Sequence, residues 1–550
     1  MRTSRPVLLS LLLCCTWLGC SEDDEPTAPD SGTAADAGFD AGMGSEDAGS
    51  DAGTGPEDAG ADAGPTDGSV RVRRFLRHHT AAGVDARPED FTRNPVELFV
   101  VEGEALVPVA GAAGGPGEYV FPDVPEGTYY LKVGSRFVVT DARTLDVSVN
   151  VLGRAEAQPL DAGSPYASMA YLNLSGVEEW NLRDYETLPL VEDPSAELHL
   201  VAEELGFVGD ISPGEAYLGA TRFQHTQAIT RISGSLTRFE AEKGDRARVV
   251  QLSPRTLGTL PDGGTQNYLT AVRALHLPPL SHDGSEALSL QGTLQPLPQA
   301  ELPLDWKVSA FAALAAEVNP TATVRGSIFG IYPGPYGQLH GSDTYAGELL
   351  RLRRPVGVTA DAVGTLTYGN PHPATWNPVT EVSTGFGVQS QVGQAPRFNV
   401  SGYILVRDLT SRLAAGPIVP RIRPPRDLTL DGTVAYGSRS LAEGAHVLGW
   451  TPPSGRGADA YEVTLWRREM LSSGASTFVR VSTFYVDESA TSVRLPPGLL
   501  QPGQHYYVTV GAVLAEGYDV SREPLRLNER AVYSEATAVS GLFSVTAAAP

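Results

Sequence analysis

Glycine and proline interrupt this chain so often that no regular element can run far. Of its 550 residues, 59 are glycine and 42 are proline, well above the roughly 12% that the two contribute on average. Between them lie short stretches in which apolar and polar side chains alternate, such as Val96, Leu98 and Val100. A period of two is typical of a strand with one buried face. The sequence therefore predicts a mainly β protein, built as several antiparallel β-sandwich domains in tandem.

Length and charge narrow the class of protein further. At roughly 150 residues per domain, 550 residues allow three or four domains. Apolar residues make up 41% of the chain, which excludes wholesale disorder. A net charge of −24 argues against a nucleic-acid partner, because a phosphate backbone is bound by a basic surface. Three cysteines are too few for a disulfide scaffold or a cysteine-built zinc module, and we expect neither a metal nor a cofactor.

The N-terminus has the pattern of an export signal. Arg2 and Arg5 form a positively charged start, and an apolar run of twelve residues follows from Val7 to Leu18. Such a run is too short to span a bilayer, which takes about 20 residues, but it suits a signal peptide. We therefore expect residues 1–19 to be a signal peptide.

The apolar run ends in Trp17-Leu18-Gly19-Cys20. This ending resembles the bacterial lipobox, in which signal peptidase II cleaves before a cysteine that already carries diacylglycerol. The resemblance implies lipidation at Cys20 and attachment to a membrane through the acyl chains. Because Ser21 follows rather than aspartate, it also implies the cell outer membrane as the destination, on either its periplasmic or its outer face. Ordinary secretion with cleavage nearby is the alternative.

Residues 20–68 combine the predicted lipidated cysteine with an acidic linker. This stretch contains fourteen acidic residues and no lysine or arginine. The triplet Asp-Ala-Gly recurs in it, beginning at Asp36, Asp40, Asp47, Asp51, Asp58 and Asp62. Such a segment has too little apolar mass to offset the entropy of ordering, so we expect it to be disordered and extended by charge repulsion. Calcium capture is the alternative, although the alternating ligands and closing glutamate of a calcium loop are missing.

Residues 69–160 predict a small β-sandwich. In the stretch from Gly117 to Gly134, a strand at Tyr119–Phe121 meets a Pro/Gly turn, and a second strand returns through Tyr129–Val133. This segment resembles the motif of the carboxypeptidase regulatory-like, or transthyretin-like, domain. The resemblance implies a structural or binding module without catalysis. A metal site at the adjacent His78-His79 is disfavoured, because neighbouring strand residues point to opposite faces.

Residues 418–545 predict a second β-sandwich. The expected strands span Asp427–Leu430, His446–Trp450, Tyr461–Trp466, Ser492–Leu495 and Tyr506–Val513. The module is longer than the usual hundred or so residues, which predicts extended loops in the 470s and the 520s.

A family resemblance supports this second sandwich. The segment from Leu500 to Ala512 reads LQPGQHYYVTVGA and is similar to the fibronectin type III signature near its sixth strand. The resemblance implies that Tyr506 forms the tyrosine corner, with its hydroxyl reaching back to the backbone just upstream. It also implies that Trp450 is the buried tryptophan of the second strand and that Tyr461 faces the core.

Residues 165–415 carry no family signature, and we predict a central β-rich domain there. A glycine followed by a hydroxyl residue and an aliphatic residue recurs at Gly234, Gly292, Gly326 and Gly364. The spacing is too uneven for a propeller or a solenoid, so we interpret these triplets as strand starts. Clustered alanines between Ser309 and Val318 predict a helix.

Aromatic residues in Gly/Pro-rich parts of this central region are the candidate ligand-binding residues. They are Tyr332, Tyr336, Tyr345, Tyr368 and Trp376. Exposed rings on rigid loops can bind sugars or peptides. The competing interpretation is that these rings fold onto the sheet, because aromatic area is usually buried.

No catalytic motif is evident. Ser281-His282-Asp283 contains the residue types of a catalytic triad, but neighbours in sequence cannot converge as a triad requires. We therefore predict no catalytic residues, and a lipid-anchored envelope or cell-surface protein whose modules bind polysaccharide, peptide or a partner protein. An envelope hydrolase with its active site in residues 165–415 is the first alternative, and a spacer without a ligand is the second. The oligomeric state is left open.

Overall fold

The computed structural model describes most of the chain after the acidic linker. The described residues are 68–103, 105–161, 163–180, 196–211, 223–233, 236–335, 347–393, 397–471 and 476–546. The predicted signal peptide, Cys20 and nearly all of the linker lie outside them. Among the described residues, no helix has both the length and the apolar character needed to cross a membrane.

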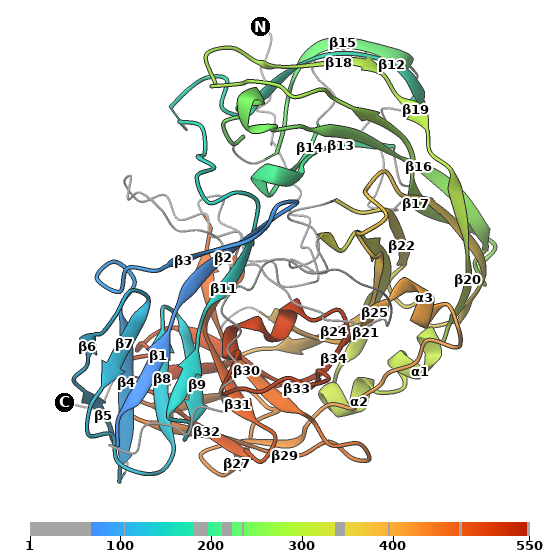
Figure 1. Ribbon diagram of the computed structural model, residues 1–550. Helices are drawn as coiled ribbons and strands as arrows, with labels where there is room; N and C mark the ends of the chain where they lie inside the picture. Colours follow the sequence, from blue (N-terminus) through green and yellow to red (C-terminus); the bar gives the residue numbers. More distant parts are fainter. Residues whose placement is uncertain are drawn as a thin grey trace, which may run out of the picture. The chain divides into compact units, whose positions relative to one another are not determined.

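The N-terminal module is a β-sandwich, shown in blue in Figure 1. Its strands are β1 (Val70–Arg73), β2 (Phe75–Thr80), β3 (Gly83–Pro88), β4 (Val96–Glu102), β5 (Ala105–Val109), β6 (Ala112–Ala113), β7 (Glu118–Phe121), β8 (Tyr129–Val133), β9 (Arg136–Thr140), β10 (Thr144–Asp146) and β11 (Val149–Leu152). One sheet has the order β10-β1-β7-β6, another contains β5-β4-β8-β9, and β11-β2-β3 forms a third. Alternate residues such as Val70, Val72, Leu98 and Leu131 are fully buried. The predicted strands at 119–121 and 129–133 are thus confirmed as β7 and β8.

The C-terminal module is also a sandwich of two sheets. Its strands are β26 (Arg426–Leu430), β27 (Thr433–Val434), β28 (Arg439–Ala442), β29 (His446–Thr451), β30 (Ala460–Met470), β31 (Ser476–Asp487), β32 (Ser492–Leu495), β33 (His505–Leu514), β34 (Tyr533–Val539) and β35 (Phe543–Thr546). One sheet has the order β27-β26-β29-β32, and β31, β30, β33 and β34 lie in that order in the other. All five predicted strands are present. The prediction of an extended loop in the 470s is wrong, because residues 476–487 form β31, the return strand of a long hairpin. The 520s do hold a long connection, which contains the 3-10 helix η5 (Pro524–Glu529).

The core of this module has the arrangement implied by the fibronectin type III resemblance. Tyr506 is fully buried, and its hydroxyl accepts a hydrogen bond from the backbone N–H of Gln501 at 2.9 Å. Trp450 and Tyr461 are buried together, with ring centroids 5.3 Å apart. The tyrosine corner and the buried tryptophan are therefore confirmed.

The central region is rich in long strands. They are β12 (Met169–Trp180), β13 (Glu197–Ala202), β14 (Phe207–Asp210), β15 (Phe223–Arg231), β16 (Arg248–Thr259), β17 (Thr265–His276), β18 (Leu288–Thr293), β19 (Gln295–Pro296), β20 (Gln299–Trp306), β21 (Thr323–Tyr332), β22 (Leu350–Arg354), β23 (Ala362–Gly369), β24 (Val379–Ser390) and β25 (Phe398–Leu409). The short helices are η1 (Glu203–Leu205), η3 (Ala241–Lys243), α1 (Val308–Ala312), α2 (Ala315–Val318) and α3 (Thr410–Leu413). The helix predicted from the alanine cluster is present as two short helices, α1 and α2.

Three of the four glycine triplets are not strand starts, and the fourth, at Gly234, lies outside the described residues. Gly326 and Gly364 lie inside β21 and β23, and Gly292 lies near the end of β18. A Cβ atom would come within 2.8 Å of a leucine methyl group at both Gly292 and Gly364. Glycine at these two positions therefore allows a neighbouring side chain to approach the strand backbone closely.

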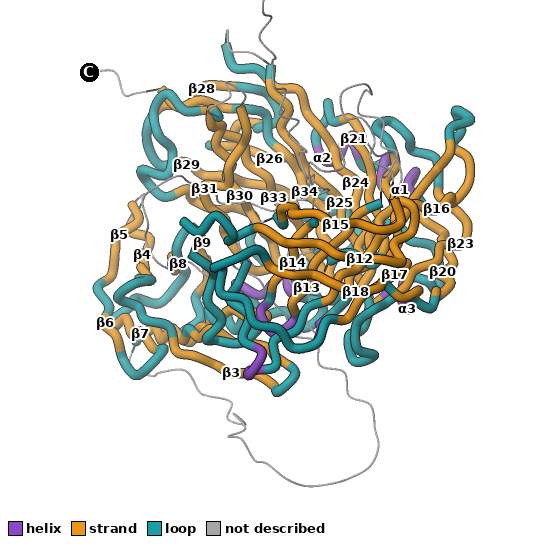
Figure 2. The backbone as a smooth tube through the Cα atoms, turned by 90° about the horizontal axis from the view of Figure 1, so that it is seen from above, coloured by secondary structure: helices purple, strands orange, loops and turns teal. Residues whose placement is uncertain are grey.

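One sheet runs through all three regions. Nineteen of the described strands belong to it, and Figure 2 shows β31, β30, β33, β34, β25 and β24 lying side by side within it. At one edge of the C-terminal module, β31 pairs in parallel with β9. At the other edge, β34 pairs antiparallel with β25. Both edges of that module's larger sheet are therefore covered by neighbouring regions, and neither is left as an open template for aggregation.

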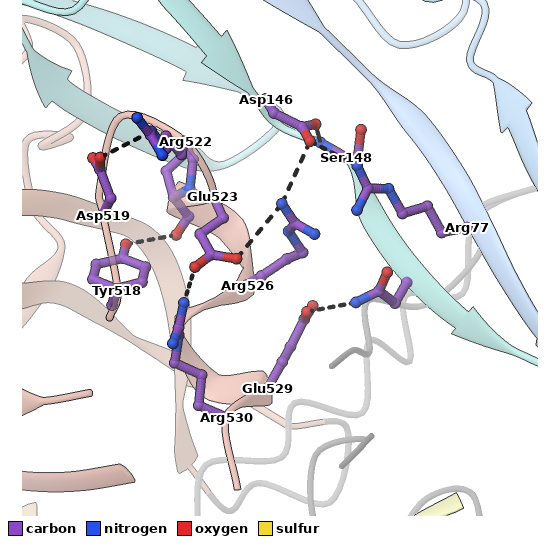
Figure 3. Close-up of polar contacts among 12 residues, drawn as sticks. Arg77, Asp146, Ser148, Tyr518, Asp519, Arg522, Glu523, Arg526, Glu529 and Arg530 are labelled. Atoms are coloured by element: carbon purple, nitrogen blue, oxygen red, sulfur yellow. Dashed lines mark hydrogen bonds and ion pairs between the residues drawn. The ribbon is translucent and has the colours of Figure 1, made fainter. Parts of the chain in front are cut away.

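Side chains reinforce the junction between the N-terminal and C-terminal modules. Asp146 on β10 accepts a hydrogen bond from Arg77 at 2.9 Å and pairs with Arg526 on η5 at 3.4 Å (Figure 3). Asn150 on β11 donates to the carboxylate of Glu529 at 3.0 Å. Burial raises the pKa of Glu529 well above its ordinary value, although Arg526 acts in the opposite direction. The connection expected to be a plain loop is thus part of the interface between the modules.

Candidate functional site

The structure places three of the five predicted ligand-binding aromatics. Tyr332 ends β21 and is 5% exposed, and Trp376 is 1% exposed and stacks on His372 with ring centroids 4.8 Å apart. Tyr368 lies on β23 and packs, half-buried, against the largest core cluster. Tyr336 and Tyr345 lie outside the described residues. The expectation of exposed rings is therefore wrong for Tyr332 and Trp376, because their aromatic area is used in packing.

A different set of side chains comes together on the long sheet. Strand register aligns Arg351 on β22 with Gly330 on β21, then with Glu381 on β24, Arg407 on β25 and Tyr533 on β34. Residues that lie directly opposite each other in neighbouring strands share a face of the sheet. A line of charged and aromatic side chains therefore crosses five adjacent strands on one face.

The line continues into the C-terminal module. Glu535 lies two residues beyond Tyr533 on β34, on the same face of the sheet. On the next strands, Gly511 of β33 lies opposite Glu462 of β30. Glu462 in turn lies opposite Tyr485 of β31. We call the following set the polar row: Arg351, Glu381, Arg407, Tyr533, Glu535, Glu462 and Tyr485. Most of its members are buried. Buried charges at this density require partners, which other members of the row and side chains next to it supply.

One buried ion pair in the row joins β24 and β25. Arg407 donates from Nε and Nη2 to one carboxylate oxygen of Glu381, at 2.8 and 2.6 Å. Burial lowers the pKa of Arg407, but the attraction of Glu381 outweighs it and leaves that pKa above its ordinary value. The guanidinium also lies 5.3 Å from the centre of the Tyr533 ring.

Glu535 is the most perturbed acid in the row. Its Oε2 atom accepts hydrogen bonds from the hydroxyls of Tyr403 at 2.5 Å and Tyr533 at 2.6 Å. Its Oε1 atom lies over Gly511, where any Cβ atom would overlap it. Burial and the nearby carboxyl group of Glu462 raise the pKa of Glu535 to about 8, against the opposing effect of the two tyrosines. This carboxyl group therefore holds a proton at neutral pH and can release it within the physiological range.

A second charged cluster lies at the β22 end of the row. Arg351 pairs with Glu197 on β13 at 2.5 Å and with Glu348 at 2.9 Å, and the ring of His199 lies 3.2 Å from Glu197. Burial raises the pKa of Glu197, but Arg351 and His199 outweigh burial and bring it to about 2. Burial lowers the pKa of His199, and Glu197 reverses this to give a raised value. The cluster is a network of fixed charges, which suits a structural clamp better than proton transfer.

Metal binding has no support in the described part of the chain. There, no three His, Cys, Asp or Glu side chains are placed to hold a metal ion together. His78 and His79 lie on β2, and the buried His79 ring is 3.1 Å from the amide oxygen of Asn150.

Comparison with known proteins adds little to this description. No protein-family model and no curated protein matches the chain. Among solved structures, a two-domain fibronectin type III segment of chicken tenascin aligns at 14% identity over 39% of this chain and 83% of its own, with a TM-score of 0.13. The FN1–FN3 domains of chicken CNTN1 align at 10% identity over 87% of this chain and 99% of their own, with a TM-score of 0.12.

Proposed function

We propose that this chain is a lipid-anchored protein of the bacterial outer membrane that displays β-sandwich modules for binding a polysaccharide, a peptide or a partner protein, without catalysis. The anchor is proposed from the sequence around Cys20, and the acidic linker after it serves as a spacer between membrane and modules. The fibronectin type III-like architecture of the C-terminal module is of a kind used in binding and adhesion.

The observation that carries the proposal is the continuous sheet. Because β9 and β25 cover the two edges of the C-terminal module, the three regions are joined by main-chain hydrogen bonds and not only by short linkers. Such pairing limits the motion of one region against the next. Rigidity of this kind lowers the entropy lost when a ligand binds.

Membrane attachment is tested by replacing the predicted lipidated cysteine. Cys20→Ala removes the acceptor of the acyl chains, so the protein should move from the membrane fraction to the soluble fraction. Cys14→Ala, within the predicted signal peptide, is the matched control and should leave fractionation unchanged. Retention of Cys20→Ala in the membrane fraction would contradict the lipoprotein proposal.

Ligand binding is tested by screening residues 69–550 on glycan and peptide arrays. A binding module should give reproducible, saturable signals for one ligand class, and the denatured chain is the control. Signals no stronger than those of the denatured chain would favour the spacer interpretation.

The polar row favours one second candidate, an envelope hydrolase. A carboxyl group that titrates near neutral pH, next to a second carboxyl group, is suited to general acid–base catalysis. The pair formed by Glu535 and Glu462 lies in the C-terminal module, at its border with residues 165–415. Hydrolysis of chromogenic glycosides or esters that is lost in Glu535→Gln but kept in Glu102→Gln, an exposed position on β4, would support this candidate. No hydrolysis by the wild-type chain would count against it.

A further inference from the structure

We propose that the pairing of β25 with β34 is a proton-controlled joint, in which a proton held by Glu535 keeps the central region and the C-terminal module together. When that proton is lost, the two strands separate more readily. The inference does not depend on which ligand the modules bind.

The joint itself is short. Its register runs from Ile404 opposite Ala536 to Arg407 opposite Tyr533. Beside it, the hydroxyl of Thr537 accepts a hydrogen bond from the backbone N–H of Tyr403 at 2.7 Å and donates to its carbonyl at 2.9 Å. A further polar link is the bond from the Tyr403 hydroxyl to Glu535. Ile404 and Val406 on β25 and Ala536 and Ala538 on β34 also share one buried apolar cluster. Glu535 is therefore one of several groups that hold the joint.

The described side chains that act on Glu535 come from several strands. Tyr403 and Arg407 are on β25, Tyr533 is on β34 and Glu462 is on β30. Glu381 on β24 acts on Tyr403 and is bonded to Arg407. Burial raises the pKa of Tyr485 on β31 and of Tyr518, and the carboxyl group of Glu462 adds to the rise in both.

These neighbours disfavour a charge on Glu535. Ionisation would place its negative charge near the carboxyl group of Glu462 in a buried site. Arg407 attracts the charge, but it already donates from two nitrogens to Glu381. The two tyrosine hydroxyls would stabilise the ionised form, yet burial and Glu462 outweigh them and raise the pKa to about 8. The closed joint therefore favours the neutral acid.

Opening of the joint must then release a proton. In the open state Glu535 meets water and ionises near its ordinary pKa of 4.5, whereas in the closed state it ionises near 8. Between these two values, linkage requires the opening equilibrium constant to rise roughly tenfold for each unit of pH. From pH 5.5 to 7.5 the expected increase is therefore about 100-fold.

Hydrogen exchange of the full chain tests the joint directly. Amides of residues 403–407 and 533–537 should lose protection by about 100-fold between pH 5.5 and 7.5, after correction for the intrinsic exchange rate. In Glu535→Gln the same amides should show little pH dependence. Glu102→Gln is the control and should behave as the wild type does.

A second variant keeps the test decisive if Glu535→Gln fails to fold. Glu462→Gln removes the repelling carboxyl group and so lowers the pKa of Glu535 in the closed joint. The loss of amide protection should therefore level off at a lower pH, and its total fold-change should be smaller. Protection in the wild type that is independent of pH would overturn the proposal. The proposal would also be overturned if protection in Glu535→Gln kept the pH dependence of the wild type. The same holds if Glu462→Gln showed a pH dependence identical to that of the wild type.

Discussion

The tyrosine corner offers the clearest quantitative test of the C-terminal module. Tyr506→Phe removes one hydroxyl and leaves the ring, which is fully buried and stacks on Phe543 at 5.9 Å. Buried apolar area is therefore unchanged, and the cost comes from one hydrogen bond. That bond is donated by the backbone N–H of Gln501 at 2.9 Å.

The expected loss in the free energy of unfolding depends on whether water can reach the backbone N–H of Gln501 once its acceptor is removed. A hydrogen bond of this kind contributes about 1 kcal/mol, and a donor left buried without a partner costs about 1–3 kcal/mol. Gln501 is an exposed residue, so water can reach its backbone after the substitution. We therefore expect the free energy of unfolding to fall by about 1 kcal/mol, near the lower end of this range.

Urea unfolding followed by tryptophan fluorescence measures this loss, and amide exchange at Gln501 locates it. Tyr368→Phe is the matched control, because no hydrogen bond involves its hydroxyl among the described residues and its ring also packs against the core. The control should change the free energy of unfolding by less than about 0.5 kcal/mol. An equal effect of the two substitutions, or unaltered exchange at Gln501, would refute the reasoning.

Three further predictions concern the polar row and its neighbour. Gly511→Ala places a Cβ atom where Oε1 of Glu535 lies, and the resulting crowding should cost about 1–3 kcal/mol in chemical denaturation. Arg407→Met leaves the carboxylate of Glu381 buried without its ion pair, which should cost about 3–5 kcal/mol in the same assay. Because the pKa of Glu197 is about 2 in the folded chain, its contribution to stability is present above pH 4.5 and lost as the pH falls towards 2. Glu197→Gln should therefore make acid unfolding in this range less steep.

Each of these has its own control. Gly457→Ala meets no atom within 4 Å and should be nearly neutral. Arg73→Met breaks an exposed pair with Glu118 and should cost no more than about 1 kcal/mol. Equal costs for Gly511→Ala and Gly457→Ala, or for Arg407→Met and Arg73→Met, would contradict the packing and burial arguments. Acid unfolding of Glu197→Gln that matches the wild type would contradict the role given to that carboxylate.

Local patterns in the sequence predicted much of the fold. Alternation at 129–133 and at 506–513 identified β8 and β33, since period two depends only on neighbouring residues. The tyrosine corner at Tyr506 was instead implied by the resemblance of residues 500–512 to the fibronectin type III signature. An extended loop was expected in the 470s only because the module exceeds the usual length, yet residues 476–487 form β31.

The polar row could not be predicted in the same way. The fibronectin type III resemblance assigned Tyr461 to the core, which leaves Glu462 on the opposite face, ordinarily the solvent side of a sandwich. Whether that second face is covered depends on pairings between residues far apart in sequence, such as Leu405 with Glu535. A signal was nevertheless present in β34, whose sequence YSEATAV has a single charged residue and is buried throughout.

The parallel pairing of β9 with β31 also has a consequence for biogenesis. Ser135, just before β9, is bonded to Ser482, which lies 347 residues later. During synthesis β9 therefore stays without this partner strand until residues 476–487 have been made. An uncovered strand invites pairing with another molecule. Truncated chains that end before residue 476 should accordingly be the species that chaperones retain.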